Sequence, residues 1–147
     1  MNRKILGILA GVALSAFASQ ALAVTATLNF KNAGVAGNPN IDYDSHTFPA
    51  GATVAPTFTG STAAPTFTVT HTESYVTSSG NAGWVRYKVR GTTKICQFNF
   101  SAIKGTSGFW TFTHQANSVG GTSATCTSAL AAGNISTGNG TWNFSAK

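Results

Sequence analysis

Hydrophobic and polar residues alternate along much of the chain. Between residues 66 and 72, threonine occupies every second position, and Phe67, Val69 and His71 lie between the threonines. A period of two places alternate side chains on opposite faces of a strand. The segment therefore predicts a strand with one packed face and one solvated face, as antiparallel sheets commonly have.

Several other segments also have the pattern of strands, and clusters of Gly, Pro, Asn and Ser separate them. The predicted strands cover residues 25–30, 53–59, 66–74, 84–90, 94–103, 108–114, 123–128 and 141–145. The Ala/Leu stretch at 128–132 is too short for a stable helix and makes at most one turn. About eight short strands predict an all-β fold, a two-sheet antiparallel β-sandwich that is Ig-like or jelly-roll-like, with a small barrel as the alternative.

The first 23 residues have the features of a cleaved secretory signal peptide. Arg3 and Lys4 precede an apolar stretch at 5–18, and Ala21 and Ala23 form a small-x-small cleavage site. The apolar stretch is shorter than the roughly 20 residues that span a bilayer. We therefore expect a bacterial-type leader at 1–23, one domain at 24–147, no transmembrane segment, and a secreted (extracellular) or periplasmic location.

The chain contains two cysteines, Cys96 and Cys126. An even count without metal-type spacing predicts one disulfide in an oxidising compartment. Closing this loop stabilises the fold by about 3.7 kcal/mol on the chain-entropy estimate. Because Cys96 alternates with Phe98 and Phe100, whereas Gln97 and Asn99 point the other way, we expect the disulfide in or beside an aromatic core.

Residues 84–90 are the most informative segment for function. Period two places Val85, Tyr87 and Val89 toward the core. The other face then carries an indole and a row of cations, with one more cation beyond a Gly-Thr-Thr turn. The predicted binding residues are Trp84, Arg86, Lys88, Arg90 and Lys94. An anionic partner would offset the repulsion within this row, whereas the alternative is a charged strand that only prevents aggregation.

The densest group of potential metal ligands is Asp42, Asp44 and His46. If the segment is extended, alternation places all three on one side, which suits a partial Ca²⁺, Cu²⁺ or Zn²⁺ site. The alternative is a turn, because Asp, Asn and Ser bond readily to nearby backbone. Recognisable catalytic motifs are absent from the sequence, and we expect no enzyme and no cofactor.

Two further patterns allow a functional and a structural interpretation. Trp110 and Trp142 share strand faces with other aromatic residues, which suits a sugar-stacking platform or, more simply, the core. Threonine occurs 22 times, often as Thr-x-Thr. Such rows are common on solvated strand faces, and a flat array of them is also suited to docking on ice or a crystalline polysaccharide.

The basic and aromatic segment gives the leading functional hypothesis. After residue 23, the chain contains seven basic residues and three acidic ones. We expect a secreted, non-catalytic binding module that recognises an anionic envelope or matrix glycan. The alternatives are a self-associating structural subunit of a surface layer, fibre or biofilm matrix, and a small membrane-active toxin that docks on lipid head groups. We expect no nucleic acid as a partner.

Overall fold

The fold is all-β, as predicted. The computed structural model describes residues 22–30, 41–57, 66–73 and 80–147, and the regular structure of these residues consists of nine strands and no helix. The strands are β1 (Leu22–Phe30), β2 (Ile41–Thr47), β3 (Thr53–Ala55), β4 (Thr66–Glu73), β5 (Asn81–Val89), β6 (Ile95–Lys104), β7 (Trp110–Ser118), β8 (Cys126–Gly133) and β9 (Gly140–Ala146). No helix among the described residues is long and apolar enough to cross a membrane. Most of the predicted leader lies outside the described residues.

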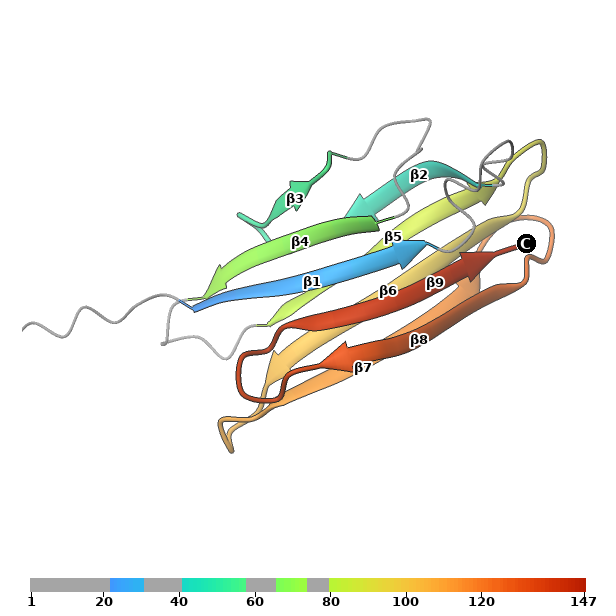
Figure 1. Cartoon of the computed structure of the whole chain (residues 1–147). Coiled ribbons are helices and arrows are strands. Elements are labelled where there is room, and N and C mark those ends of the chain that lie inside the picture. The colour runs from blue at the N-terminus through green and yellow to red at the C-terminus, as the bar shows by residue number, and fades with distance from the viewer. Residues whose placement is uncertain (1–21, 31–40, 58–65, 74–79) are drawn as a thin grey trace, which may run out of the picture.

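The strands form two sheets that pack face to face (Figure 1). The five-stranded sheet has the order β3-β4-β1-β9-β8, and the four-stranded sheet has the order β2-β5-β6-β7. The predicted sandwich is confirmed, with one difference. The β1 and β9 strands pair in parallel, whereas every other neighbouring pair is antiparallel. The first and last of the described strands are therefore adjacent in the middle of one sheet.

The core fills the space between the two sheets with aromatic side chains. The largest fully buried ones include Trp142, Tyr87, Phe30, Phe67, Phe98 and Phe144. Phe30 from the five-stranded sheet lies 4.5 Å, centroid to centroid, from Tyr87 of the four-stranded sheet. Each such ring removes about 150–250 Å² from water. Trp110 and Trp142 are both buried, which confirms the core interpretation of these two residues.

The disulfide joins the two sheets at the edge of this core. Cys96 of β6 is fully buried, and its Sγ bonds to Cys126 at the start of β8, with the two Cα atoms 5.6 Å apart. The predicted pairing and its position beside the aromatic core are both confirmed. The bond fixes the loop between β7 and β8, because Cys126 is the first residue after that loop to enter a strand.

Asn81 forms a second connection between the sheets. Its side chain is fully buried at the start of β5, and its Nδ2 donates hydrogen bonds to the carbonyl oxygens of Val24 (3.0 Å) and Val69 (2.9 Å). These carbonyls belong to β1 and β4 of the opposite sheet. Residues 78–83 lie between the predicted strands 66–74 and 84–90, and their Gly, Asn and Ser content indicated a loop. The structure instead begins β5 at Asn81. The side-chain amide donates to backbone carbonyls of the other sheet and not to the backbone of a local turn.

Two other segments form strands beyond those predicted. The stretch 128–132 forms no helical turn and lies in β8, where pairing with β9 outweighs the helix preference of Ala and Leu. The 41–47 segment, which lay outside the predicted strands, forms the edge strand β2. A bulge between Tyr43 and Ser45 interrupts its pairing with β5. Bulges are one way in which edge strands discourage pairing with other chains.

Candidate functional site

The outer surface of the four-stranded sheet carries the predicted basic segment. Val85 and Tyr87 are fully buried and Val89 is half-buried, which confirms the predicted alternation along β5. Trp84 and Arg86 are half-buried on the opposite face, and Lys88 there is exposed. Their side chains therefore lie in one row along the solvated side of a central strand.

Strand register places a set of side-chain amides beside this row. Trp84 lies opposite Asn99 and Arg86 lies opposite Gln97 on β6. The next strand, β7, places Gln115 opposite Asn99 and Asn117 opposite Gln97. Residues directly opposite one another in a sheet share a face. We call the resulting surface the basic face, and its members are Trp84, Arg86, Lys88, Gln97, Asn99, Gln115 and Asn117.

The centre of the basic face is held by a chain of interactions. The Arg86 guanidinium carbon lies 4.7 Å from the centroid of the Trp84 ring, in cation–π geometry. Arg86 Nε donates to Gln97 Oε1 at 2.8 Å, and Gln97 Nε2 donates to Asn99 Oδ1 at 3.0 Å. These contacts fix the guanidinium plane, and its terminal N–H groups form no hydrogen bond with another described residue. An orientation fixed before binding reduces the entropy lost when a ligand binds.

Arg90 does not belong to this row of available cations. It lies in the turn after β5, where its Nη2 contacts Asp42 Oδ1 of β2 at 2.5 Å. The hydrogen bond from Arg90 holds the pKa of Asp42 below its ordinary value, and the nearby Lys88 charge acts in the same direction. The pair therefore neutralises Asp42, and the exposed Lys88 remains without an ion-pair partner among the described residues.

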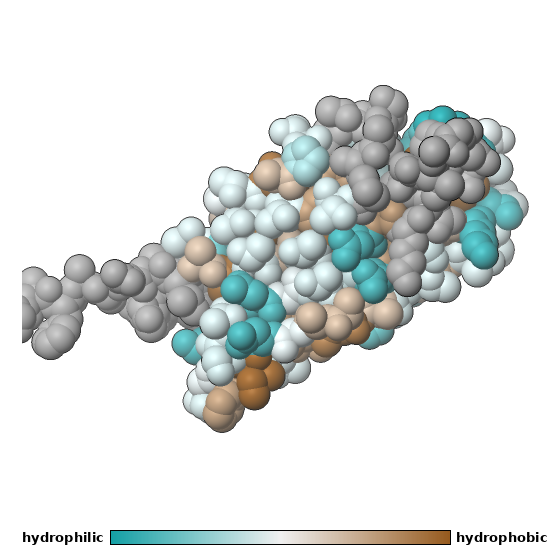
Figure 2. Space-filling view, viewed as in Figure 1, coloured by the Kyte–Doolittle hydropathy of each residue, from teal (hydrophilic) through white to brown (hydrophobic). Residues whose placement is uncertain are grey.

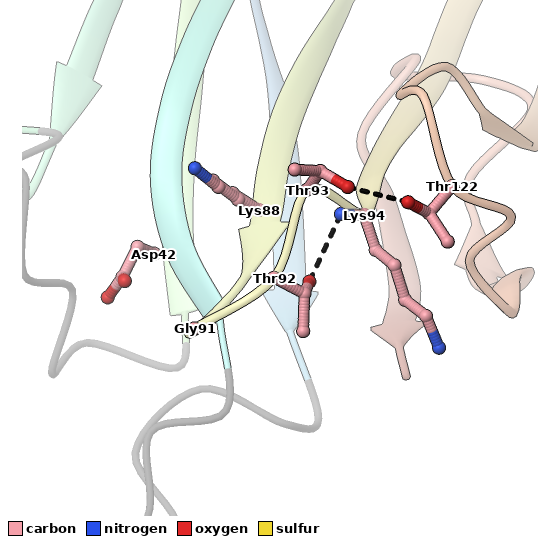
Figure 3. Close-up of a pocket in the computed structure, with 7 residues that line it drawn as sticks. All are labelled: Asp42, Lys88, Gly91, Thr92, Thr93, Lys94 and Thr122. Atoms are coloured by element: carbon pink, nitrogen blue, oxygen red, sulfur yellow. Dashed lines mark hydrogen bonds between the residues drawn. The ribbon is translucent and has the colours of Figure 1, made fainter.

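An open pocket lies at the end of the basic face where β5 turns into β6 (Figure 3). Its volume is about 640 Å³. The lining residues are Asp42, Lys88, Gly91, Thr92, Thr93, Lys94 and Thr122. Lys88 and Lys94 extend to different sides of the turn (Figure 3), and neither forms an ion pair with another described residue. The pocket thus adjoins the basic face at Lys88 and contributes one further cation, Lys94, together with threonine hydroxyls.

The loop between β7 and β8 closes one side of this pocket. Thr122 of the loop shares a 2.6 Å hydrogen bond with Thr93, hydroxyl to hydroxyl. A Cβ atom at Gly120 would lie 2.5 Å from the carbonyl oxygen of Thr93, so only glycine permits this close approach. The Thr92 hydroxyl donates to the carbonyl oxygen of Val89 at 2.8 Å and accepts from the backbone N–H of Lys94 at 3.0 Å. The pocket therefore has a defined shape.

The structure does not gather the three predicted metal ligands. Asp42 bonds to Arg90, Asp44 accepts a hydrogen bond from Ser45 Oγ at 2.7 Å, and His46 Nδ1 bonds to the Tyr43 hydroxyl at 2.6 Å. Burial lowers the pKa of His46 below its ordinary value. Among the described residues, no group of three or more His, Cys, Asp or Glu side chains lies close enough to hold a metal ion.

Sequence reasoning missed part of the basic face. Gln97 and Asn99 were expected to point outward, but Gln115 and Asn117 were not considered, because the predicted strand ended at residue 114. The structure extends β7 to Ser118. The alternation of Gln115 and Asn117 around Ala116 was the available signal. The Asp42–Arg90 pair joins residues that are 48 positions apart in the sequence, and the local sequence pattern does not predict it.

Comparison with known proteins gives no further guidance. No family model matches the chain, and neither a curated protein nor a solved structure matches it. The functional argument therefore rests on the residues themselves.

Proposed function

We propose that this chain is an extracytoplasmic, non-catalytic binding module whose basic face recognises an acidic polysaccharide of an envelope or extracellular matrix. The observation that carries the proposal is the arrangement of Trp84, Arg86 and Lys88 in one solvated row beside four side-chain amides. This row presents charge, hydrogen-bonding groups and apolar surface along one line. An extended polymer can contact all three along its length.

Each kind of group on the basic face has a role toward a sugar polymer. The Arg86 guanidinium donates paired N–H bonds that match the oxygens of a carboxylate or sulfate. The amides of Asn99, Gln115 and Asn117 donate and accept, as sugar hydroxyls do. The indole of Trp84 supplies apolar surface with a negative π face, which attracts the partially positive C–H groups of a sugar ring.

Charge favours an acidic polymer over a neutral one at this face. Lys88 and Lys94 line the adjoining pocket, and the nearby carboxylate of Asp42 is bound to Arg90. The uncompensated positive potential attracts a polyanion and speeds its association. The disulfide supports the predicted export, since such bonds persist mainly in oxidising compartments.

Paired substitutions with equal charge change test the proposal. Arg86→Gln with Lys88→Gln removes two charges from the basic face, and Lys104→Gln with Lys147→Gln removes two charges elsewhere. Alginate serves as a carboxylated probe, dextran sulfate as a sulfated probe and dextran as a neutral control. We expect the first pair to weaken binding to an acidic probe by about tenfold or more, because charge-assisted hydrogen bonds are lost.

Salt provides an independent readout in the same assay. Binding of the wild-type protein to the acidic probe should weaken as ionic strength rises and screening becomes stronger. Equal losses of affinity for the acidic probe in the two double variants would indicate attraction by net charge alone. That result, or the absence of binding to both acidic probes, would overturn the proposal.

A further inference from the structure

The outer surface of the five-stranded sheet differs sharply in chemistry from the basic face. On β1, β4 and β9, every outward position within residues 25–29, 66–72 and 141–145 is Thr, Asn or Ser. We call this surface the threonine face. None of its residues is charged, although the chain carries a net positive charge. Figure 2 views the molecule from this side, and the surface there is mostly pale, which marks intermediate hydropathy.

Strand register assembles the separate Thr-x-Thr motifs into a grid. Thr27 lies between Thr68 of β4 and Thr141 of β9, and Thr25 lies opposite Thr70. Equivalent hydroxyls are thereby repeated about every 6.7 Å along the strands and about every 4.8 Å across them. A repeating grid of identical groups suits a partner with its own repeat.

Part of the grid is already ordered by its own hydrogen bonds. Thr66 Oγ1 donates to Asn29 Oδ1 at 2.9 Å, and Asn29 Nδ2 donates to Asn143 Oδ1 at 3.1 Å. The three side chains therefore form one chain of hydrogen bonds across β4, β1 and β9. Their orientation is set before any ligand arrives, which lowers the entropy cost of binding.

Composition argues against a protein as the occupant. Centres of protein interfaces are enriched in aromatic residues, Met and Arg, and the threonine face has none of these. The described large apolar side chains that are exposed, such as Phe109 and Ile135, lie outside β1, β4 and β9. The absence of charge also lowers the cost of removing water from the face, since charges are the most expensive groups to desolvate.

We infer that the threonine face is a second binding surface, for a neutral, hydroxyl-rich insoluble polysaccharide. Threonine offers a hydroxyl that donates and accepts together with a methyl group that packs against C–H groups. The inference does not depend on the proposed function of the basic face. If both surfaces bind, the molecule connects a neutral polymer on one side to an acidic polymer on the other.

The test is retention of the mature protein on microcrystalline cellulose, chitin, insoluble β-glucan and starch granules at low and high salt. We expect retention on at least one polymer, unchanged by salt, because no charge takes part. Thr27→Lys places a charge at the centre of the grid and should reduce retention by about tenfold or more. Thr111→Lys is the matched control, since Thr111 is exposed on the outer face of the other sheet.

Several results would overturn the inference. These are no retention on any of the four polymers, retention lost at high salt, or equal retention of wild type and Thr27→Lys. Slowed ice growth without retention on a polysaccharide would assign the face to ice instead. If Thr27→Lys fails to fold, Thr68→Lys on the neighbouring strand makes the same test. Arg86→Gln with Lys88→Gln should leave this retention unchanged, which separates the two surfaces.

Discussion

Replacing Asn81 with leucine tests the idea that one buried amide holds the two sheets together. Leucine keeps the branched shape of the side chain, but its methyl groups are larger than the amide atoms and cannot donate to the carbonyl oxygens of Val24 and Val69. The substitution therefore removes the two inter-sheet hydrogen bonds and places a methyl group where the amide nitrogen approached these oxygens.

The expected loss follows from these contacts. Two hydrogen bonds contribute about 1–3 kcal/mol together, and buried carbonyls left without a donor add to the cost. The Asn81 Oδ1 atom is buried without a partner among the described residues. Because leucine removes this unsatisfied acceptor, part of the loss in stability is offset. We expect a net destabilisation of about 2–3 kcal/mol, which lowers the melting temperature of a domain of this size by roughly 10 °C.

Urea unfolding followed by tryptophan fluorescence measures the change. The midpoint should fall while the slope with urea stays constant, because the surface exposed on unfolding is nearly the same. Asn117→Leu, on the outer face of β7, is the matched control and should change stability by no more than about 0.5 kcal/mol. A value that small for Asn81→Leu would refute the role assigned to this amide.

Three further predictions follow from the site. Reducing the Cys96–Cys126 disulfide should lower stability by about 3–4 kcal/mol and also weaken binding to the acidic probe, because the loop carrying Thr122 is released. Urea unfolding and binding with and without reductant check both effects, and a loss of stability with unchanged affinity would contradict the second. Gly120→Ala should weaken binding to the same probe severalfold with an intact core, since the new Cβ would lie 2.5 Å from the Thr93 carbonyl oxygen; an unchanged affinity would show that the loop position does not matter. The carboxyl of Asp42 should titrate by NMR below the ordinary range of aspartate, and Arg90→Gln should raise that pKa. Because the folded-state pKa is depressed, the contribution of the pair is present at neutral pH and is lost as the pH falls through it; no change in Arg90→Gln would contradict the assignment.

The local alternation of residues was a good guide where one strand face packs on the core. It placed Val85 and Tyr87 inward and Arg86 outward, and it placed Cys96 among the core aromatics. These features depend on a period of two within one strand, which the sequence displays directly. The disulfide followed from the even cysteine count, the absence of metal-type spacing and the expected oxidising compartment.

Features that depend on partners from other strands could not be predicted. Asn81 has the chemistry of a turn residue, but carbonyls of the opposite sheet satisfy it. The strand β8 is stabilised by β9 against its own helix preference. The amides of Gln115 and Asn117 reach the basic face only through the register of β6 with β7. In each case tertiary pairing outweighs the local preference.

The central claim is that the basic face contacts an acidic polysaccharide, and NMR titration with alginate or dextran sulfate tests it most directly. The indole N–H of Trp84 and the side-chain amides of Gln97 and Asn99 should shift as the polymer is added. The indole signals of the buried Trp110 and Trp142 should change little. Shifts confined to the threonine face, or spread evenly over the molecule, would contradict the claim.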